Sequence, residues 1–200
     1  YTLHSYLEDD EDLETVDPYT KVKNFVGKDF HFELLKAIQW DNNLLVADHY
    51  RDRRVLLAGD ATHQYIPTGG YGMNTGVGDA FDLGWKLSAV IQEWGGDKLL
   101  DSVEEERRPI ALRNREGSKR HAEARIAIGR IWPDNISESG PNGDKTRKSV
   151  AEQIIRVGNA ENESLGIEIG YNYASSSIIC KTDQDIMQDD PLTYLSLIHI

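Results

Sequence analysis

The sequence has a single cysteine, Cys180, and no long hydrophobic run. One cysteine cannot close an intrachain disulfide, and a cysteine-based zinc site needs more than one thiolate. No basic segment followed by an apolar stretch opens the chain, and no apolar run is long enough to span a bilayer. These absences indicate a soluble protein, for which we expect a reducing, cytoplasmic location and no membrane partner.

Basic residues are also scarce, since 22 lysines and arginines face 34 acids and leave a net charge of −12. Six of the seven residues from Glu8 to Glu14 are acidic, a run most simply explained as a solvated segment. The backbone of a nucleic acid or an anionic membrane would repel such a chain, so neither is expected as a partner. The histidines lack the paired spacing of metal ligands, and no metal site is predicted.

Both ends of the sequence are unusual. No methionine precedes Met73, and we therefore expect the sequence to be cut from a longer protein. At the other end, residues 195–200 follow an acidic segment abruptly and resemble a translated sequencing-adaptor tail. We interpret these last residues as non-native and leave them out of the fold prediction.

The most informative stretch runs from Arg54 to Leu87 and joins an apolar strand, a carboxylate, a glycine-rich loop and a helix. Residues 55–58 form a continuous apolar run, which is typical of a parallel strand covered on both faces. Asp60 follows at the carboxyl end of this strand, where open α/β sheets bind ligands. The pattern therefore predicts an α/β fold with a ligand site behind the strand.

Apolar residues at helical spacing predict a long amphipathic helix from about Asn74 to Trp94, which Gly95 and Gly96 would end. A capping-box pattern at Ser102 predicts the start of another helix, which Pro109 interrupts or kinks. Further helices are expected in the second half of residues 19–40, over residues 111–130 and over residues 145–157, and a half-buried strand is expected over residues 167–173.

Three glycines lie inside the predicted long helix, namely Gly76, Gly78 and Gly84. Each costs about 1 kcal/mol of helix propensity relative to alanine. A side chain is usually left out where the backbone closely approaches a neighbour or a ligand. We therefore expect such an approach at these positions.

The loop between strand and helix offers groups that suit a flat ligand with a sugar-like chain. Asp60 can accept hydrogen bonds from two neighbouring hydroxyls of a ribityl or ribose group, or alternatively cap the turn that follows it. Gly69, Gly70 and Gly72 admit positive φ and let a ligand touch the backbone itself. Pro67 stiffens the approach to these glycines.

Asn74 and Thr75 fall at the start of the predicted long helix, where unpaired amides and the helix dipole favour an electron-rich or anionic group. That group is either the pyrimidine edge of a flavin, whose negative charge on reduction the helix would stabilise, or a phosphate. His63 lies beside the loop and is interpreted as a hydrogen-bonding scaffold rather than as a general base.

The stretch as a whole closely resembles the second FAD-binding fingerprint of class A flavoprotein aromatic hydroxylases, the para-hydroxybenzoate hydroxylase-like family. The motifs that carry the likeness are GDATH (59–63), PTGG (67–70), GMNTG (72–76) and DAFDLGWKL (79–87). The likeness covers roughly residues 40–194, and IGYNY (169–173) is similar to a segment of the phenol and chlorophenol hydroxylases. Asp82 stands where the family commonly has asparagine.

This resemblance implies that Asp60 binds the ribityl chain of FAD. It also implies that residues 67–72 line the flavin and that residues 72–74 offer backbone donors to its pyrimidine ring. The cofactor-binding residues implied in this way are Gly59, Asp60, Pro67, Gly69, Gly70, Gly72, Met73 and Asn74. The resemblance assigns no catalytic residue to this chain.

The family's amino-terminal βαβ unit with its GxGxxG motif, which holds the ADP half of FAD, is not found in the sequence. The resemblance therefore implies a carboxyl-side fragment of a Rossmann-like FAD/NAD(P)-binding domain. Residues 1–43 would be a remnant of the substrate domain, residues 44–130 the carboxyl-side part of the FAD-binding domain and residues 131–194 a mostly helical extension.

The function that the resemblance implies is hydroxylation of a small phenolic or other aromatic substrate with O2 and NAD(P)H. Two alternatives stay open. One is a related flavin epoxidase or reductase that shares the fingerprint. The other is a noncatalytic flavin-binding or interaction fragment, since the sequence has only half of the cofactor site.

Overall fold

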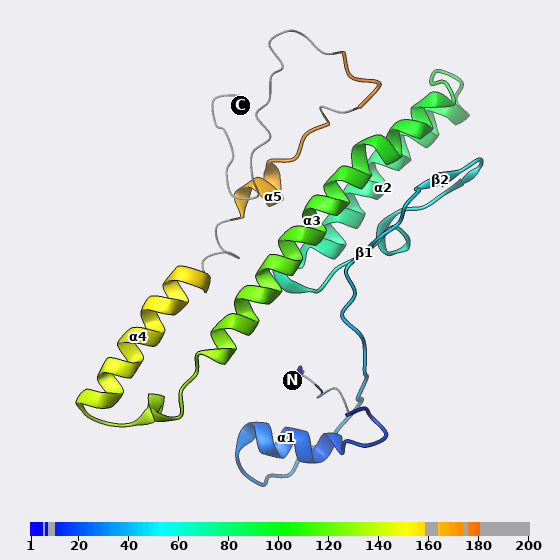
Figure 1. The fold of residues 1–200 in the computed structure, drawn as a ribbon. Helices are drawn as coiled ribbons and strands as arrows, with labels where there is room; N and C mark the ends of the chain where they lie inside the picture. The colour runs from blue at the N-terminus through cyan, green and yellow to red at the C-terminus, as the bar shows by residue number, and fades with distance from the viewer. Residues whose placement is uncertain (6, 8–10, 159–163, 174–175, 181–200) are drawn as a thin grey trace. The chain divides into compact units, whose positions relative to one another are not determined.

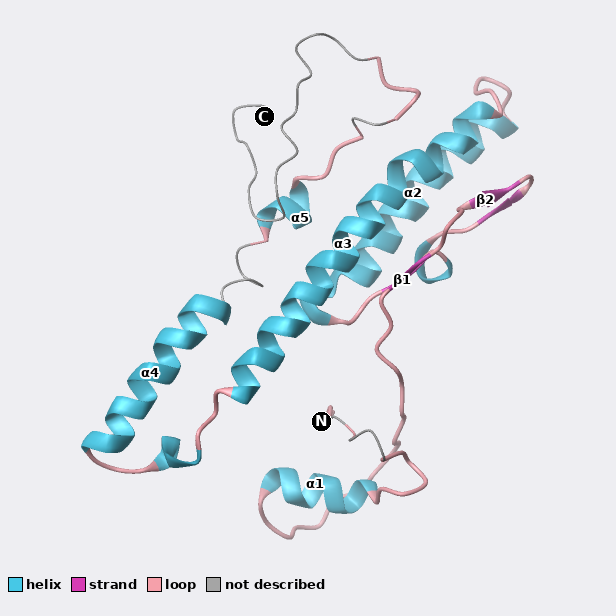
Figure 2. Cartoon of the chain, viewed as in Figure 1, coloured by secondary structure: helices cyan, strands magenta, loops and turns pink. Residues whose placement is uncertain are grey.

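The computed structural model describes residues 1–5, 7, 11–158, 164–173 and 176–180. The chain divides into two compact units, residues 1–42 and residues 43–200. Helices make up most of the regular secondary structure that is described (Figure 2). The predicted domain ranges stay predictions, and the expected non-native tail at residues 195–200 lies outside the described residues.

The first unit is built around helix α1, Pro18–Val26. Asp17 caps its start, because the carboxylate accepts two backbone amides of the first turn at 3.1 and 3.2 Å. The helix ends at Gly27, whose φ of 77° is the left-handed conformation that glycine adopts easily. The helix predicted in the second half of residues 19–40 is wrong, because residues 29–40 have no regular secondary structure and the capping signals lie earlier.

The second unit combines long helices with short strands. Its helices are α2 (Tyr71–Ile91), α3 (Lys98–Arg130), α4 (Pro141–Gly158) and the short α5 (Leu165–Ile169). Short 3-10 helices are η1 (Gly59–Ala61), η2 (Thr68–Gly70) and η3 (Asp134–Ser137). Two antiparallel strand pairs complete it: β1 (Leu45–Val46) with β4 (His63–Gln64), and β2 (Arg51–Asp52) with β3 (Val55–Leu56).

The buried parallel strand predicted at residues 55–58 is instead one arm of a short antiparallel hairpin. β3 covers only Val55 and Leu56, and the side chain of Val55 is largely in solvent, since the residue is 62% exposed. Within the described part of the chain, β3 pairs only with β2. An apolar run becomes a buried parallel strand only where neighbouring strands and helices cover it, and these neighbours are not local in sequence.

The predicted long helix is confirmed as α2, although it begins three residues earlier than expected, at Tyr71. Gly70 precedes it in the left-handed conformation, with a φ of 69°. At the other end the helix stops at Ile91, and the amide of Gly95 turns back to the carbonyl of Ala89 at 2.9 Å. Gly95 therefore belongs to the stop signal, as the sequence predicts.

A single continuous helix, α3, replaces the two segments predicted on either side of Pro109. The helix start predicted at Ser102 is wrong, because Ser102 is buried inside α3 and donates its hydroxyl to the carbonyl of Leu99 at 2.8 Å. α3 lies beside α2 (Figure 1). Buried residues close to the proline are Glu106, Arg107, Ile110 and Ala111. Tertiary packing therefore outweighs the roughly 3 kcal/mol by which proline disfavours a helix interior.

A helix also stands where the sequence predicts a strand. α5 covers Leu165–Ile169 and residues 170–173 have no regular secondary structure, so the strand predicted at residues 167–173 is wrong. Ile167 is only 2% exposed and lies against Gly117 of α3, where any Cβ would collide with it. The apolar pattern thus reflects a contact with α3 rather than one face of a sheet.

α4 confirms the helix predicted at residues 145–157 and begins four residues earlier, at Pro141. Proline is common in the first helical turn, because the amide that it lacks would have no partner within the helix. Neither α4 nor any other helix that the structure describes is long and apolar enough to cross a membrane.

Candidate functional site

The residues predicted to bind a cofactor lie on two segments that the fold brings together. Gly59 and Asp60 belong to η1. The others lie where η2 meets α2: Pro67, Gly69, Gly70, Gly72, Met73 and Asn74. η1 contacts α2, and a Cβ on Gly76 would lie 3.3 Å from the Cα of Gly59. The close approach predicted at Gly76 therefore joins the two segments of the candidate site.

Two glycines shape the turn before α2. Gly69 and Gly70 have φ of 81° and 69°, which confirms the positive φ predicted for them. The same prediction is wrong for Gly72, which belongs to the first turn of α2. A Cβ at Gly69 would collide with the side chains of Tyr71 and His121. No described atom lies within 4 Å of a Cβ built on Gly70, so the turn is open on this side.

The first turn of α2 presents backbone donors. Gly72 and Met73 lie within it, where amides have no acceptor inside the helix and where the helix dipole is positive. The side-chain amide of Asn74 donates to the carbonyl of Gly70 at 2.8 Å and so closes the turn. This end of the helix suits an electron-rich ring edge and a phosphate equally well.

Asp60 is exposed on η1. Its carboxylate accepts no hydrogen bond from any residue that the structure describes, and the position before η1 is held by Ala58 without a side-chain cap. The structure therefore gives Asp60 no capping bond of the kind considered as an alternative. The carboxylate is available to hydroxyl donors of a ligand.

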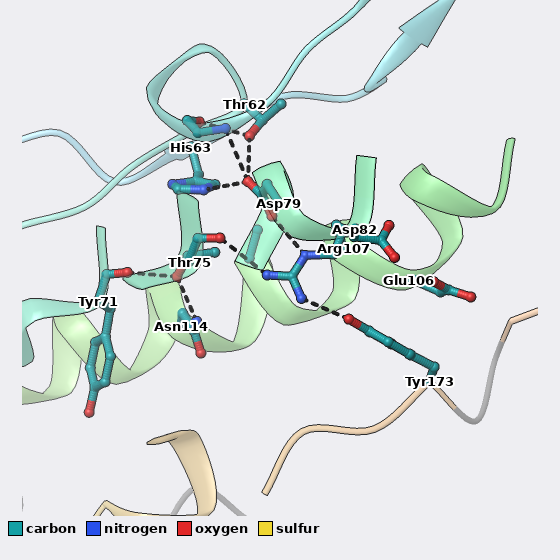
Figure 3. A network of polar contacts seen from close by, with 12 residues as sticks. Thr62, His63, Tyr71, Thr75, Asp79, Asp82, Glu106, Arg107, Asn114 and Tyr173 are labelled. Carbon is teal, nitrogen blue, oxygen red and sulfur yellow. Dashed lines mark hydrogen bonds and ion pairs between the residues drawn. The ribbon is translucent and has the colours of Figure 1, made fainter. Parts of the chain in front are cut away.

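Asp79 of α2 is a buried acid at the centre of a polar network (Figure 3). Its Oδ2 accepts the amide of Gly59 at 3.1 Å and lies 2.9 Å from Nε2 of His63. The hydroxyl of Thr62 approaches the same oxygen at 3.4 Å. Its Oδ1 accepts Nε of Arg107 at 2.8 Å. Both carboxylate oxygens are therefore used, and His63 makes a hydrogen bond of the scaffolding kind.

Arg107 of α3 extends this network to a second point on α2 and to the segment that follows α5 (Figure 3). Its Nη2 donates to the carbonyl of Thr75 at 3.2 Å, and its Nη1 donates to the hydroxyl of Tyr173 at 3.1 Å. The guanidinium fills the space beside Gly78, where a Cβ would lie 2.5 Å from Nη2. The close approach predicted at Gly78 is thus confirmed. At Gly84 no described atom lies within 4 Å of a Cβ built there, so the approach to a neighbour or ligand expected at this position stays a prediction.

The charges of Asp79 and Arg107 sustain each other despite their burial. Burial alone would raise the pKa of Asp79, but hydrogen bonds from His63 and Arg107 outweigh it and hold that pKa below its usual value. Burial would likewise lower the pKa of Arg107, and the hydrogen bond and charge of Asp79 raise it instead. The two side chains therefore form a buried ion pair in which neither charge is left unpaired.

The junction of η2 and α2 is also fixed to α3. The hydroxyl of Thr68 donates to the carbonyl of Ser118 at 2.7 Å, and the hydroxyl of Ser118 donates to the carbonyl of Ile66 at 2.6 Å. The side-chain amide of Asn114 donates to the hydroxyl of Thr75 at 2.8 Å. Side chains of α3 therefore hold this segment of the site from behind.

A second buried ion cluster lies further along α2 and α3. Nζ of Lys86 contacts Oδ2 of Asp82 at 2.9 Å and Oε2 of Glu106 at 2.5 Å. The hydroxyl of Ser176 donates to the other oxygen of Glu106. Burial raises the pKa of Asp82, and Lys86 offsets this effect only in part. The acid at position 82 therefore has a structural partner in Lys86.

The sequence does not single out Asp79 or Arg107. A residue of the same type but with another role lies close to each in the sequence. Asp82 follows Asp79 on α2, and Arg108 follows Arg107 on α3. The usable signal is the helical position of Asp79, because an acid on the packed side of an amphipathic helix needs a buried partner. Finding that partner requires the pairing of α2 with α3, which is not a local property.

Comparison with known proteins gives a family match and several relatives. Residues 8–118 match the model of a family described as FAD binding domain. The FAD-dependent monooxygenase opdD of Penicillium oxalicum is 37% identical over 172 residues, which cover 84% of this chain and 32% of that protein. The 4-methyl-5-nitrocatechol 5-monooxygenase of a Burkholderia species is 33% identical over 156 residues, 78% of this chain and 24% of that protein.

Among solved structures, that of the rebeccamycin biosynthetic enzyme RebC with reduced flavin is similar to this chain, with a TM-score of 0.75. The two are 39% identical, and the match covers 84% of this chain and 32% of the other. The chain thus spans about a third or less of the length of the relatives it matches. The family match covers more than half of the chain and includes every predicted cofactor-binding residue.

Proposed function

The chain belongs to the FAD-binding domain family of class A FAD-dependent aromatic hydroxylases, and from this premise we propose that it holds the ribityl chain and the flavin ring of FAD. The observation that carries the proposal is the contact between Gly59 and Gly76. This contact places η1, with its exposed carboxylate, against the helix whose first turn presents backbone donors.

The residues present fit a flavin. A flat ring needs backbone rather than side chains beside it, and Gly70 offers a left-handed turn that is open on one side. A ribityl chain needs an acceptor for its hydroxyls, which the exposed carboxylate of Asp60 would supply. Backbone groups near both would complete the binding site, at Gly59, Pro67, Gly69, Gly72, Met73 and Asn74.

The contribution of this chain to a reaction is binding and electrostatics. When bound, FAD would supply the redox chemistry that links NAD(P)H, O2 and an aromatic substrate. The positive end of α2 would stabilise negative charge on the ring edge that faces it. Asp60 would fix the ribityl chain that carries the ring. We assign no residue of this chain to proton transfer.

For the whole protein, we infer that it hydroxylates a small phenolic or other aromatic substrate with O2 and NAD(P)H. The support is that relatives over most of this chain are monooxygenases, one of them named for a nitrocatechol. Incorporation of label from isotopically labelled O2 into a hydroxylated product tests the inference. Oxidation of NAD(P)H without any labelled product would instead favour a flavin reductase.

We also propose that residues 44–130 form the carboxyl-side part of a Rossmann-like domain that lacks its amino-terminal βαβ unit. Residues 1–43 would then come from the substrate domain, and residues 131–194 would form a helical extension. One supporting observation is an exposed apolar stripe on α2, at Met73, Val77 and Phe81. Exposed apolar surface of this extent is usual where further structure covers a helix.

The decisive experiment replaces Asp60. In the full-length protein, Asp60→Ala should raise the Kd for FAD at least tenfold, because a hydrogen bond to a charged group contributes about 1.5–3 kcal/mol and about 1.4 kcal/mol corresponds to tenfold. Quenching of flavin fluorescence during a titration measures this Kd. Asp52→Ala removes another exposed aspartate, on β2, and should leave Kd unchanged. Equal affinity of the native protein and Asp60→Ala would refute the ribityl assignment.

A further inference from the structure

Asp79 is the point at which η1 attaches to α2. Among the described residues, every hydrogen bond between residues 59–63 and α2 ends on the carboxylate of Asp79. The backbones of Gly59 and Gly76 touch there without any side chain between them. The two glycines let the segments pack closely, but packing alone does not fix the orientation of η1 on α2. The hydrogen bonds to Asp79 fix that orientation, because hydrogen bonds are directional.

The other segment of the site has anchors of its own. Side chains of α3 bond to the η2 side through Thr68 and Ser118, and to α2 through Asn114 and Thr75. No comparable bond from α3 to η1 is present among the described residues. Loss of the Asp79 carboxylate would therefore release η1, with Asp60, and leave the start of α2 in place.

Arg107 sets the orientation of that carboxylate. Its Nε holds Oδ1 of Asp79, which leaves Oδ2 turned toward Gly59 and His63 (Figure 3). Its Nη2 donates a hydrogen bond to the carbonyl of Thr75, which lies one helical turn before Asp79 on the same helix. The guanidinium is thus attached to α2 at two levels, and Gly78 leaves the room that it needs.

We propose that Asp79 and Arg107 are a positioning pair for the bound flavin, which fixes the Asp60 carboxylate relative to the first turn of α2. This inference rests on the proposed function, since it assumes that these two segments hold FAD. Neither residue touches the ligand in this proposal. A ligand that spans two segments binds tightly only when both are held in the right relative position.

The test compares two buried acids of α2. Asp79→Asn removes the anchor of η1, whereas Asp82→Asn breaks the ion pair with Lys86 and touches no residue of η1. Both changes replace a buried carboxylate by an amide of nearly the same size, and in Asp82→Asn Lys86 keeps Glu106 as its ion-pair partner. In the full-length protein, Asp79→Asn should raise the Kd for FAD at least about tenfold and shift the visible absorption bands of the bound flavin, while Asp82→Asn should change neither.

Asp79→Asn leaves Arg107 without its charged partner, and the variant protein would then be too unstable to fold if this cost is large. A double variant keeps the test decisive in that case. Asp79→Asn with Arg107→Gln removes both buried charges together and should recover Tm, because no charge is left unpaired. Its affinity for FAD should stay low, because the amide of Gly59 and His63 still lack their charged acceptor. Recovery of both Tm and native affinity in the double variant would overturn the proposal.

The remaining outcomes separate this inference from the one on which it rests. If the native protein does not bind FAD, the proposed function fails, and the positioning role fails with it. If the native protein binds FAD and Asp60→Ala weakens binding, but Asp79→Asn and Asp82→Asn have equal effects, only the positioning role is overturned.

Discussion

Gly69 satisfies two conditions at once, a left-handed backbone and a lack of space for any side chain. Gly69→Ala should therefore lower the free energy of unfolding by about 2 kcal/mol or more, since the backbone strain alone costs about 1–2 kcal/mol. Gly84 has neither condition, and Gly84→Ala should raise the free energy of unfolding by up to about 1 kcal/mol through helix propensity. Urea unfolding of both variants measures these changes, and effects of the same sign would contradict this account of the glycines.

The lowered pKa of Asp79 also has a consequence for stability. The unfolded chain takes up a proton at this residue near its ordinary pKa of 3.8, whereas the folded chain does so only at lower pH. The stability that Asp79 contributes is therefore fully present above the unfolded pKa and is lost as pH falls through the folded pKa. Asp82, with its raised pKa, acts in the opposite direction.

A comparison of proteins that differ only in the Asp79–Arg107 pair removes the effect of Asp82. Between pH 5 and pH 2, the free energy of unfolding of the native chain should fall more steeply than that of the Asp79→Asn, Arg107→Gln double variant. Denaturant titrations at several pH values measure the two slopes. Parallel slopes would show that Asp79 has no lowered pKa in the folded state.

Among the elements, those whose signals are local could be predicted. α2 follows from its apolar period and from Gly95, and α4 follows from its own composition. β3 and α5 could not be predicted, because an apolar run such as residues 55–58 takes its structure from whatever covers it. The roles of Asp79 and Arg107 could not be predicted for the same reason, because their ion pair forms only when α2 packs against α3.

The passage of α3 through Pro109 makes the largest departure from local propensity. Pro109 is exposed, so its replacement removes little packing. Pro109→Ala should raise the free energy of unfolding by about 1–2 kcal/mol, because the roughly 3 kcal/mol penalty of proline in a helix interior is partly offset by the greater freedom of the unfolded chain. Thermal and urea unfolding measure the change. A loss of stability would indicate that the proline ring itself has a packing role.

For the molecule as a whole, the motifs of residues 59–87 identified the family correctly, and the family match now confirms that resemblance. The predicted site residues do lie on two adjoining segments, but their role in binding FAD stays a prediction. The chemistry of the loop left a flavin and a phosphate equally possible. What selected the flavin was the resemblance, because both ligands use the same helix end.

The chain of 200 residues by itself should bind FAD weakly or not at all. Its candidate site addresses the ribityl chain and the ring, whereas its sequence contains no GxGxxG motif for the ADP half. Fluorescence titration of the purified chain measures the affinity. Submicromolar binding would contradict the view that the ADP-binding unit is required.

Four donors share the buried carboxylate of Asp79, and this arrangement limits which substitutions the sequence can accept during evolution. Without Asp79, Arg107 would be a buried cation that lacks a charged partner. Without Arg107, Asp79 would keep its other donors but lose its countercharge. A lineage that loses either residue first therefore passes through a less stable intermediate. Positions 79 and 107 should therefore change together or not at all among related sequences. Where both have become neutral, the loop of residues 59–63 should carry a different tether to the helix behind it.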